Sequence, residues 1–136
     1  KTAAAVRHVK LGPGGLSDVE WSVQLLQMCH ASDVPGLRCV STGDALRAAV
    51  SAGLISAPDA ETLRTAWMMA MSIRAANVLG SGRTTGKKLD LLPVDRLLVT
   101  TAALLGYAEG AHQDLTDDWM RTARLARGVV EQIFYD

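Results

Sequence analysis

The placement of proline is the feature that most constrains the fold of this chain. Its four prolines (Pro13, Pro35, Pro58 and Pro93) each stand where a run of helix-forming residues would begin or end. Proline is tolerated in the first turn of a helix but breaks a helix interior, so the long proline-free stretches are free to be helical. The best helix formers are also abundant, with 20 alanines and 18 leucines against 12 valines, three isoleucines and six aromatic residues. These residues predict an all-α protein.

Start and stop signals divide the chain into about five helices, which we expect to pack as an antiparallel helix bundle. The expected helices cover residues 18–30, 42–52, 56–79, 93–106 and 114–134. Ser41 is expected to cap the second helix, and Ser17 with Glu20 forms the S-x-x-E pattern of a capping box at the first. The first helix has apolar residues around most of its circumference, which predicts that it lies deep in the bundle.

Length and charge narrow the class of protein. The 136 residues are close to the usual size of one domain. Fourteen basic and fourteen acidic residues balance, which argues against a nucleic-acid or membrane-surface binder. The two cysteines, Cys29 and Cys39, and three scattered histidines lack the spacing of a metal site. We therefore expect a cytoplasmic domain with no metal of its own and no nucleic-acid or membrane partner.

A basic loop at residues 81–88 superficially resembles a phosphate-binding P-loop. A P-loop has glycine where Ser81 stands, serine or threonine where Lys88 stands, and a strand before it. The loop meets none of these requirements, so the sequence predicts a solvated loop.

The glycine-rich turn at residues 12–15, directly before the first helix, is the segment most suggestive of function. Backbone N–H groups and the dipole at a helix N-terminus form a natural binding place for an anion, and Lys10 adds a positive charge nearby. Asp18 meets the positive end of the same dipole. The alternative is that Gly14 and Gly15 make only a tight turn and that Glu20 only closes the capping box. Both interpretations stay open on the residues alone.

Two polar groups interrupt otherwise apolar helix faces. Glu20, Gln24 and Gln27 share one face of the first helix because they are four and three residues apart. Such a stripe suits a wall that faces a cleft or a partner domain. Arg74 and Asn77 interrupt the third helix in a similar way. Either group is equally compatible with a satisfied, buried hydrogen-bond network.

At the glycine-rich turn the sequence resembles a known family. Residues 7–21, which include Gly-Pro-Gly-Gly-Leu-Ser-Asp-Val-Glu-Trp, and residues 23–27 resemble the segment that follows the nucleotidyltransferase core in glutamine synthetase adenylyltransferase of the actinobacterial type. The similarity continues almost to the end of the chain, through residues 41–46, 67–77, 92–93, 104–107 and 129–135.

The resemblance implies a piece of a larger bifunctional enzyme that regulates nitrogen assimilation. One nucleotidyltransferase core of that enzyme transfers AMP from ATP to a tyrosine of glutamine synthetase, and another removes it by phosphorolysis, under control of the PII signal protein and glutamine. Residues 1–15 would be a connector from a missing core, and residues 16–136 the helical bundle domain of the adenylylating half. ATP and Mg²⁺ would be held mainly by that core, so we expect no catalytic residue and no cofactor in this chain, and no activity from it alone.

The leading hypothesis is that the bundle completes the cleft of the missing core. On this hypothesis six residues face the nucleotide or the core: Lys10, Gly14, Gly15, Asp18, Glu20 and Gln24. A second hypothesis is an interaction module that docks glutamine synthetase or the PII signal protein, which predicts an exposed apolar patch away from the first helix. A third is the related helical domain of PII uridylyltransferase.

Overall fold

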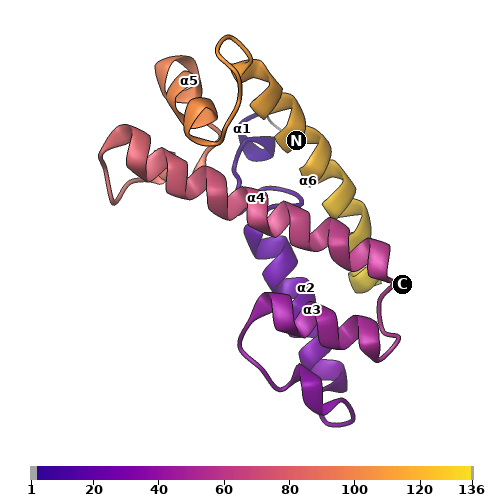
Figure 1. Cartoon of the computed structure of the whole chain (residues 1–136). Coiled ribbons are helices and arrows are strands. Elements are labelled where there is room, and N and C mark those ends of the chain that lie inside the picture. The colour runs from indigo at the N-terminus through magenta and orange to yellow at the C-terminus, as the bar shows by residue number, and fades with distance from the viewer. Residues whose placement is uncertain (1–2, 136) are drawn as a thin grey trace.

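The structure is a computed structural model that describes residues 3–135. Its helices and 3-10 turns are α1 (Ala3–Val6), α2 (Leu16–His30), η1 (Pro35–Leu37), α3 (Thr42–Ser51), α4 (Ala57–Ser81), η2 (Lys87–Asp90), α5 (Asp95–Leu104) and α6 (His112–Tyr135). Five of the helices are longer than one turn, and they pack as a bundle (Figure 1). The predicted all-α class and helix bundle are therefore confirmed.

Serine caps fix the beginnings of α3 and α4. The Oγ of Ser41 accepts a hydrogen bond from the amide of Asp44 at 3.3 Å, and the Oγ of Ser56 accepts one from Asp59 at 3.2 Å. Each cap satisfies an amide that has no partner within its helix, and each aspartate adds a favourable charge to the first turn. The predicted cap at Ser41 and the predicted start near Ser56 are confirmed.

The other end of α4 lies two residues beyond the predicted end at Leu79. The helix ends at Ser81, and its C-cap is Gly82, which has a left-handed backbone with φ +71°. Gly80 is still helical, and its lack of a side chain lets α5 pack closely against it. A Cβ on Gly80 would lie 3.0 Å from the Cγ2 of Thr100. Of the two glycines, the second is therefore the one that stops the helix.

The beginning of α2 differs from the predicted capping box. The N-cap is Gly15, which has no side chain to accept a hydrogen bond, and Ser17 is a buried residue of the first turn. The amides of Leu16 and Ser17 instead donate to the carbonyls of Val9 and Lys10, both at 2.8 Å. The prediction of a capping box is therefore wrong. The chain before α2 supplies the hydrogen-bond acceptors that the side chains of Ser17 and Glu20 would have supplied.

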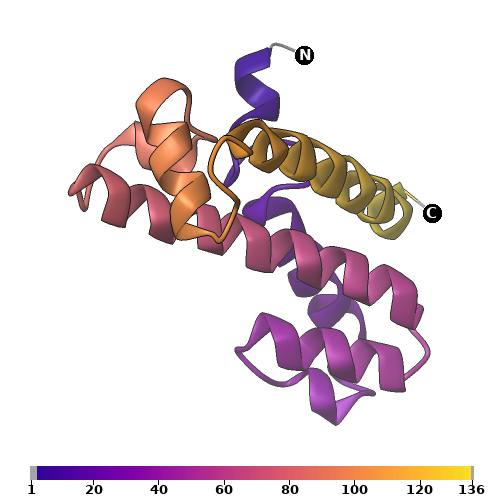
Figure 2. The same cartoon turned by 45° about the horizontal axis from the view of Figure 1, so that its top comes forward.

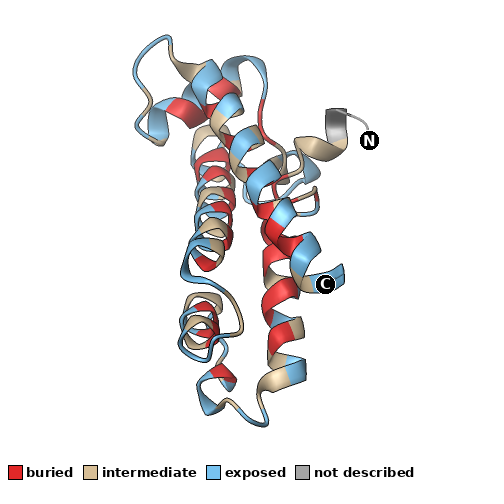
Figure 3. Ribbon diagram, turned by 90° about the vertical axis from the view of Figure 1, so that its right-hand side faces the viewer, coloured by how far each residue is buried: buried red, intermediate tan, exposed pale blue. Residues whose placement is uncertain are grey.

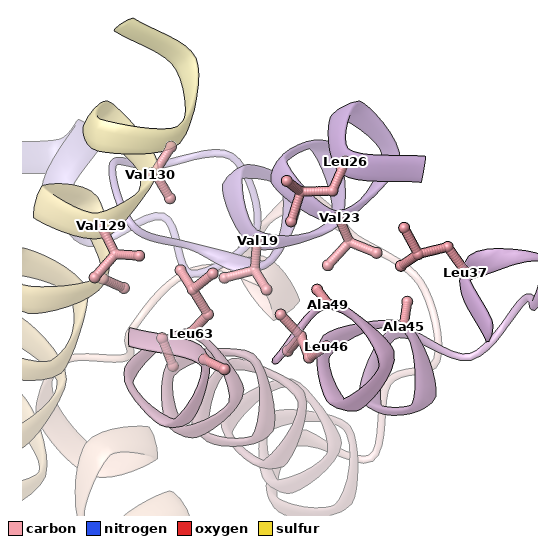
Figure 4. Packing of buried hydrophobic residues seen from close by; sticks show 13 residues of the cluster. Val19, Val23, Leu26, Leu37, Ala45, Leu46, Ala49, Leu63, Val129 and Val130 are labelled. Atoms are coloured by element: carbon pink, nitrogen blue, oxygen red, sulfur yellow. The ribbon is translucent and has the colours of Figure 1, made fainter. Parts of the chain in front are cut away.

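The long helix α4 runs through the centre of the molecule (Figures 1 and 2), and two hydrophobic clusters lie along it. The first joins α2, α3, the N-terminal half of α4 and the C-terminal half of α6 (Figure 4), and it includes Val19, Val23, Leu46, Leu63 and Val130. The second joins the C-terminal half of α4 to α5 and the N-terminal half of α6, and it includes Val9, Ile73, Leu98, Leu115 and Trp119. Since α4 and α6 share both clusters in opposite order, the two helices are antiparallel.

One face of α2 has no cover from the described residues. Val19, Val23 and Leu26 face the core, but Trp21 is 53% exposed and Met28 is 83% exposed. Buried residues gather on the helix faces that look toward the interior, and the outer faces are exposed (Figure 3). The expectation that the first helix lies deep in the bundle is therefore wrong, because its apolar residues continue onto a face that nothing in the described chain covers.

Candidate functional site

The glycine-rich turn packs directly on the backbone of α6. Gly14 has φ +71°, and a Cβ there would lie 1.9 Å from the carbonyl oxygen of Ala123. A Cβ on Gly15 would lie 2.6 Å from the carbonyl oxygen of Val9. Because the obstructing atoms belong to the backbone, they do not move aside as the end of a flexible side chain would. The turn is therefore an integral part of the helical domain, and only glycine fits at these two positions.

Asp18 ties the turn, α2 and α6 together. Its Oδ2 accepts hydrogen bonds from the amide of Gly14 and from Nη1 of Arg127, both at 2.8 Å, and its side chain is only 12% exposed. Arg127 also donates through Nε to Glu131 at 3.1 Å. The hydrogen bond to Asp18 is the main cause that raises the pKa of Arg127 above its already high usual value, so this partly buried guanidinium stays charged.

These hydrogen bonds occupy the donors that an anion would need. The Gly14 amide is bound to Asp18, the Gly15 amide donates to the carbonyl of Gly12 at 3.0 Å, and the first two amides of α2 have carbonyl partners as well. The Asp18 carboxylate also places a negative charge beside the turn. The expectation that the turn offers free amides to an anion is therefore wrong.

A hollow of about 410 Å³ lies on the outer side of the turn. It is lined by His8 and Leu11 and by the ion pair of Asp18 with Arg127. The Nδ1 of His8 accepts a hydrogen bond from the amide of Leu11 at 3.0 Å, which holds this edge of the hollow. Lys10 is next to Leu11 in the chain, and its side chain has no hydrogen bond or ion pair with residues 3–135.

The polar stripe on α2 serves two different purposes. Gln27 donates through Nε2 to the carbonyls of Leu37 and Cys39, at 3.0 and 2.8 Å, and so holds the connection between α2 and α3. Glu20 is half-buried and Gln24 is exposed, and neither side chain bonds to another described residue. Gln27 therefore belongs to a structural network, whereas Glu20 and Gln24 are available to a partner.

Asn77 is the centre of a satisfied, buried network. Its Nδ2 donates to the carbonyls of Leu89 and Leu91, at 3.0 and 2.9 Å, and its Oδ1 accepts from the hydroxyl of Thr101 at 3.0 Å. The side chain is fully buried. This arrangement fixes the segment after α4 against both α4 and α5, so the interruption of the apolar pattern on α4 has a structural purpose.

The chain before the turn pairs with the chain before α5. The amide of Val9 donates to the carbonyl of Asp90 at 2.8 Å, and the amide of Leu92 donates to the carbonyl of Arg7 at 2.7 Å. The guanidinium of Arg7 also donates to the carbonyls of Leu92 and Pro93. No local pattern in the sequence indicates this antiparallel bridge, because its two segments are more than 80 residues apart.

Side chains that commonly ligate metals do not cluster in the described part of the chain. Within residues 3–135 no group of three or more His, Cys, Asp or Glu side chains is placed to hold a metal ion. Cys29 and Cys39 are free thiols. Among the same residues, no helix combines the length and the hydropathy that a membrane crossing requires.

Comparison with known proteins gives the family. The family model described as "GlnD PII-uridylyltransferase" matches residues 2–136. The chain belongs to this family. Curated relatives named bifunctional glutamine synthetase adenylyltransferase/adenylyl-removing enzyme match it closely. That of Streptomyces coelicolor is 49% identical over 94% of the chain, that of Leifsonia xyli subsp. xyli 45% over 98%, and that of Mycobacterium avium 41% over 93%.

The chain spans only 12 to 13% of the length of these three relatives. It therefore corresponds to a small portion of the adenylyltransferase, and the resemblance found at residues 7–21 is confirmed. The three relatives are named for adenylyl transfer and removal, whereas the family as a whole is described by uridylyl transfer. The relatives thus favour the adenylyltransferase over the uridylyltransferase.

Proposed function

We propose that this chain is the helical domain of a bifunctional glutamine synthetase adenylyltransferase and completes the cleft of its nucleotidyltransferase core. In that enzyme the core transfers AMP from ATP to a tyrosine of glutamine synthetase, or a second core removes it by phosphorolysis. ATP and Mg²⁺ are held by the core, since the described residues lack a metal site and the glycine-rich turn lacks free amides. The chain alone has no catalytic residue and is inactive.

The uncovered face of α2 carries this proposal. Trp21, Gln24 and Met28 lie on one side of the helix, because they are three and four residues apart, and all three are exposed. A half-exposed tryptophan next to an exposed methionine is typical of the anchor residues of an interface. Because the relatives are about eight times longer than this chain, the rest of the enzyme is available to cover this face.

The predicted site residues divide into two groups on this proposal. The backbone of Lys10 lies beside the first turn of α2, because its carbonyl accepts the amide hydrogen of Ser17. Lys10, Glu20 and Gln24 therefore make polar contacts with the core around the apolar anchors. Gly14, Gly15 and Asp18 instead fix the turn on α6, so they position this surface without touching the nucleotide.

The test is AMP transfer to glutamine synthetase by the full-length enzyme that carries Trp21→Ser and Met28→Ser together. Removing two apolar anchors is expected to weaken the binding free energy between the helical domain and the core by about 2 kcal/mol. The rate of AMP transfer should therefore fall by at least about tenfold. Val99→Ser with Leu125→Ser is the matched control, since both residues are exposed and lie on α5 and α6. A normal rate in the α2 variant, or an equal loss in the control, contradicts the proposal.

A second candidate function is the docking of glutamine synthetase or the PII signal protein by the domain itself. It is favoured by a separate apolar surface on α4, where Met68, Met71 and Leu79 are exposed. These residues belong to α4 and not to α2, as this function requires. A pull-down by the 136-residue chain tests it, with Met71→Ser and Leu79→Ser together as the variant that must lose binding. If neither protein is retained by the unmodified chain, this candidate is wrong.

A further inference from the structure

Four basic side chains surround one hollow at the end of α4. The hollow measures about 560 Å³ and is lined by Arg83, Lys87 and Lys88 from the segment after α4 and by Arg96 from α5. None of the residues that line it carries a carboxylate. Since the whole chain has equal numbers of basic and acidic residues, this is a local excess of positive charge. The segment lies beside α5, far from the C-terminus of the chain (Figure 1).

The positive charge at this hollow has no internal partner. In the described part of the chain, five other arginines pair with carboxylates: Arg47, Arg64, Arg74, Arg121 and Arg127. The side chains of the four basic residues at the hollow form no ion pair or hydrogen bond with any described residue. None of these four side chains donates a hydrogen bond to a carbonyl of α4, so they do not cap that helix. Their charges are available to a ligand.

The backbone that carries the two lysines is held in place. Asn77 binds the carbonyls on either side of Asp90, and the Asp90 carboxylate accepts a hydrogen bond from Nε of Arg74 at 2.6 Å. These bonds fix η2, and with it Lys87 and Lys88, on the side of α4. The site is thus preorganised at its base, which lowers the ordering cost of binding.

The shape of the hollow favours a small ligand over a protein surface. Gly82 and Gly86 have positive φ, and a Cβ on either would meet nothing within 4 Å, so the loop backbone is open to close approach. Leu89 and Leu97 add apolar lining beside the basic side chains. A concave site that is lined by several cations and no carboxylate suits several adjacent phosphate groups.

We infer that this hollow binds a small molecule that carries a polyphosphate group. The binding mode differs from that of a P-loop, because separated cations from the loop and from α5 converge on the phosphates. Arg96 is essential to this inference, and the sequence of the loop alone does not include it. The inference does not depend on the proposed function, since it rests on a different surface.

Isothermal titration calorimetry of the 136-residue chain with inorganic triphosphate, in EDTA, tests the inference. We expect binding that weakens strongly between about 50 and about 200 mM salt, because the contacts are charged. Lys87→Gln with Lys88→Gln should weaken binding at least about tenfold. Arg64→Gln with Arg124→Gln is the matched control, since it removes the same charge from exposed sites elsewhere, and it should change affinity less than about twofold.

A comparison of ADP with inorganic diphosphate identifies the source of the phosphate. Tighter binding of ADP assigns the apolar lining to a nucleobase and supports a nucleotide site, and equal binding supports a site for inorganic phosphates. No binding of triphosphate by the unmodified chain overturns the inference, as does an equal loss in the lysine and control variants. Binding of a polyglutamate peptide in place of triphosphate also overturns it, in favour of an acidic protein partner.

Discussion

Replacing Gly14 by alanine should destabilise the domain more than any ordinary surface change. The new Cβ would lie 1.9 Å from the carbonyl oxygen of Ala123, whereas real contacts are essentially never below 3.0 Å. The turn must therefore move away from α6 by about 1 Å. Such a shift stretches the 2.8 Å hydrogen bond between the Gly14 amide and Asp18 and loosens the ion pair with Arg127.

The size of the effect follows from three contributions. An L-residue in the left-handed region costs about 1–2 kcal/mol. Loss of a hydrogen bond to a buried carboxylate adds about 1.5–3 kcal/mol. Poorer packing of the turn on α6 adds a smaller amount, so the total is about 3–5 kcal/mol. For a domain of this length each kcal/mol corresponds to about 3–4 °C in Tm, so we expect a fall of roughly 10–18 °C.

Two other glycines provide the controls for the measurement by urea and thermal unfolding. Gly53 also has positive φ, at +74°, but a Cβ there would meet nothing within 4 Å, so Gly53→Ala should cost only about 1–2 kcal/mol. Gly128 lies inside α6 with open space around it, so Gly128→Ala should stabilise the domain by about 0.5–1 kcal/mol. If Gly14→Ala unfolds no more readily than Gly53→Ala, the close contact with α6 is refuted.

Two further predictions concern a helix cap and a titrating tyrosine. Ser56→Ala should lower the free energy of unfolding in urea by about 1 kcal/mol, because the Oγ of Ser56 caps α4. Ser17→Ala should lower it by less than about 0.5 kcal/mol, because Ser17 is not the cap of α2. Equal losses would contradict Gly15 as the N-cap of α2. Burial and the 2.6 Å hydrogen bond to Asp118 raise the pKa of Tyr107 from 10.0 to about 12. The folded protein therefore keeps a proton that the unfolded chain releases, so stability should fall between pH 10 and about pH 12. Thermal unfolding over this range should show a shallower fall in Tyr107→Phe, and an unchanged slope would show that Tyr107 is not the cause.

The all-α class and the beginnings of α3 and α4 are the parts of the fold that the sequence predicts best. A capping serine or a proline acts on amides within three or four residues of itself, so Ser41 and Ser56 determine where α3 and α4 begin. The same local logic fails at α2, because the Ser17–Glu20 pattern competes with acceptors from Val9 and Lys10. A capping pattern predicts a helix start only where no other part of the chain reaches those amides first.

Local sequence patterns predict neither how deeply α2 is buried nor which residues Asp18 contacts, and the reasons differ. A helix that is apolar around its whole circumference needs neighbouring elements on both of its faces. The sequence does not show whether the element on the second face belongs to the same chain. Trp21 and Met28 are therefore expected inside the bundle and are found on its surface. Arg127 lies 109 residues from Asp18, and neither helical periodicity nor motif spacing relates two positions so far apart.

The contacts of the glycine-rich turn also determine the order in which the domain folds. Its Gly14 rests on Ala123, and Arg127 binds Asp18 at the start of α2, so these contacts form only after α6 has been synthesised. Closing a loop of this length carries an entropic cost that is recovered only when α6 docks. The glycine-rich turn is therefore among the last parts of the domain to become ordered, and removing the final turns of α6 would unfold the beginning of the domain as well as its end.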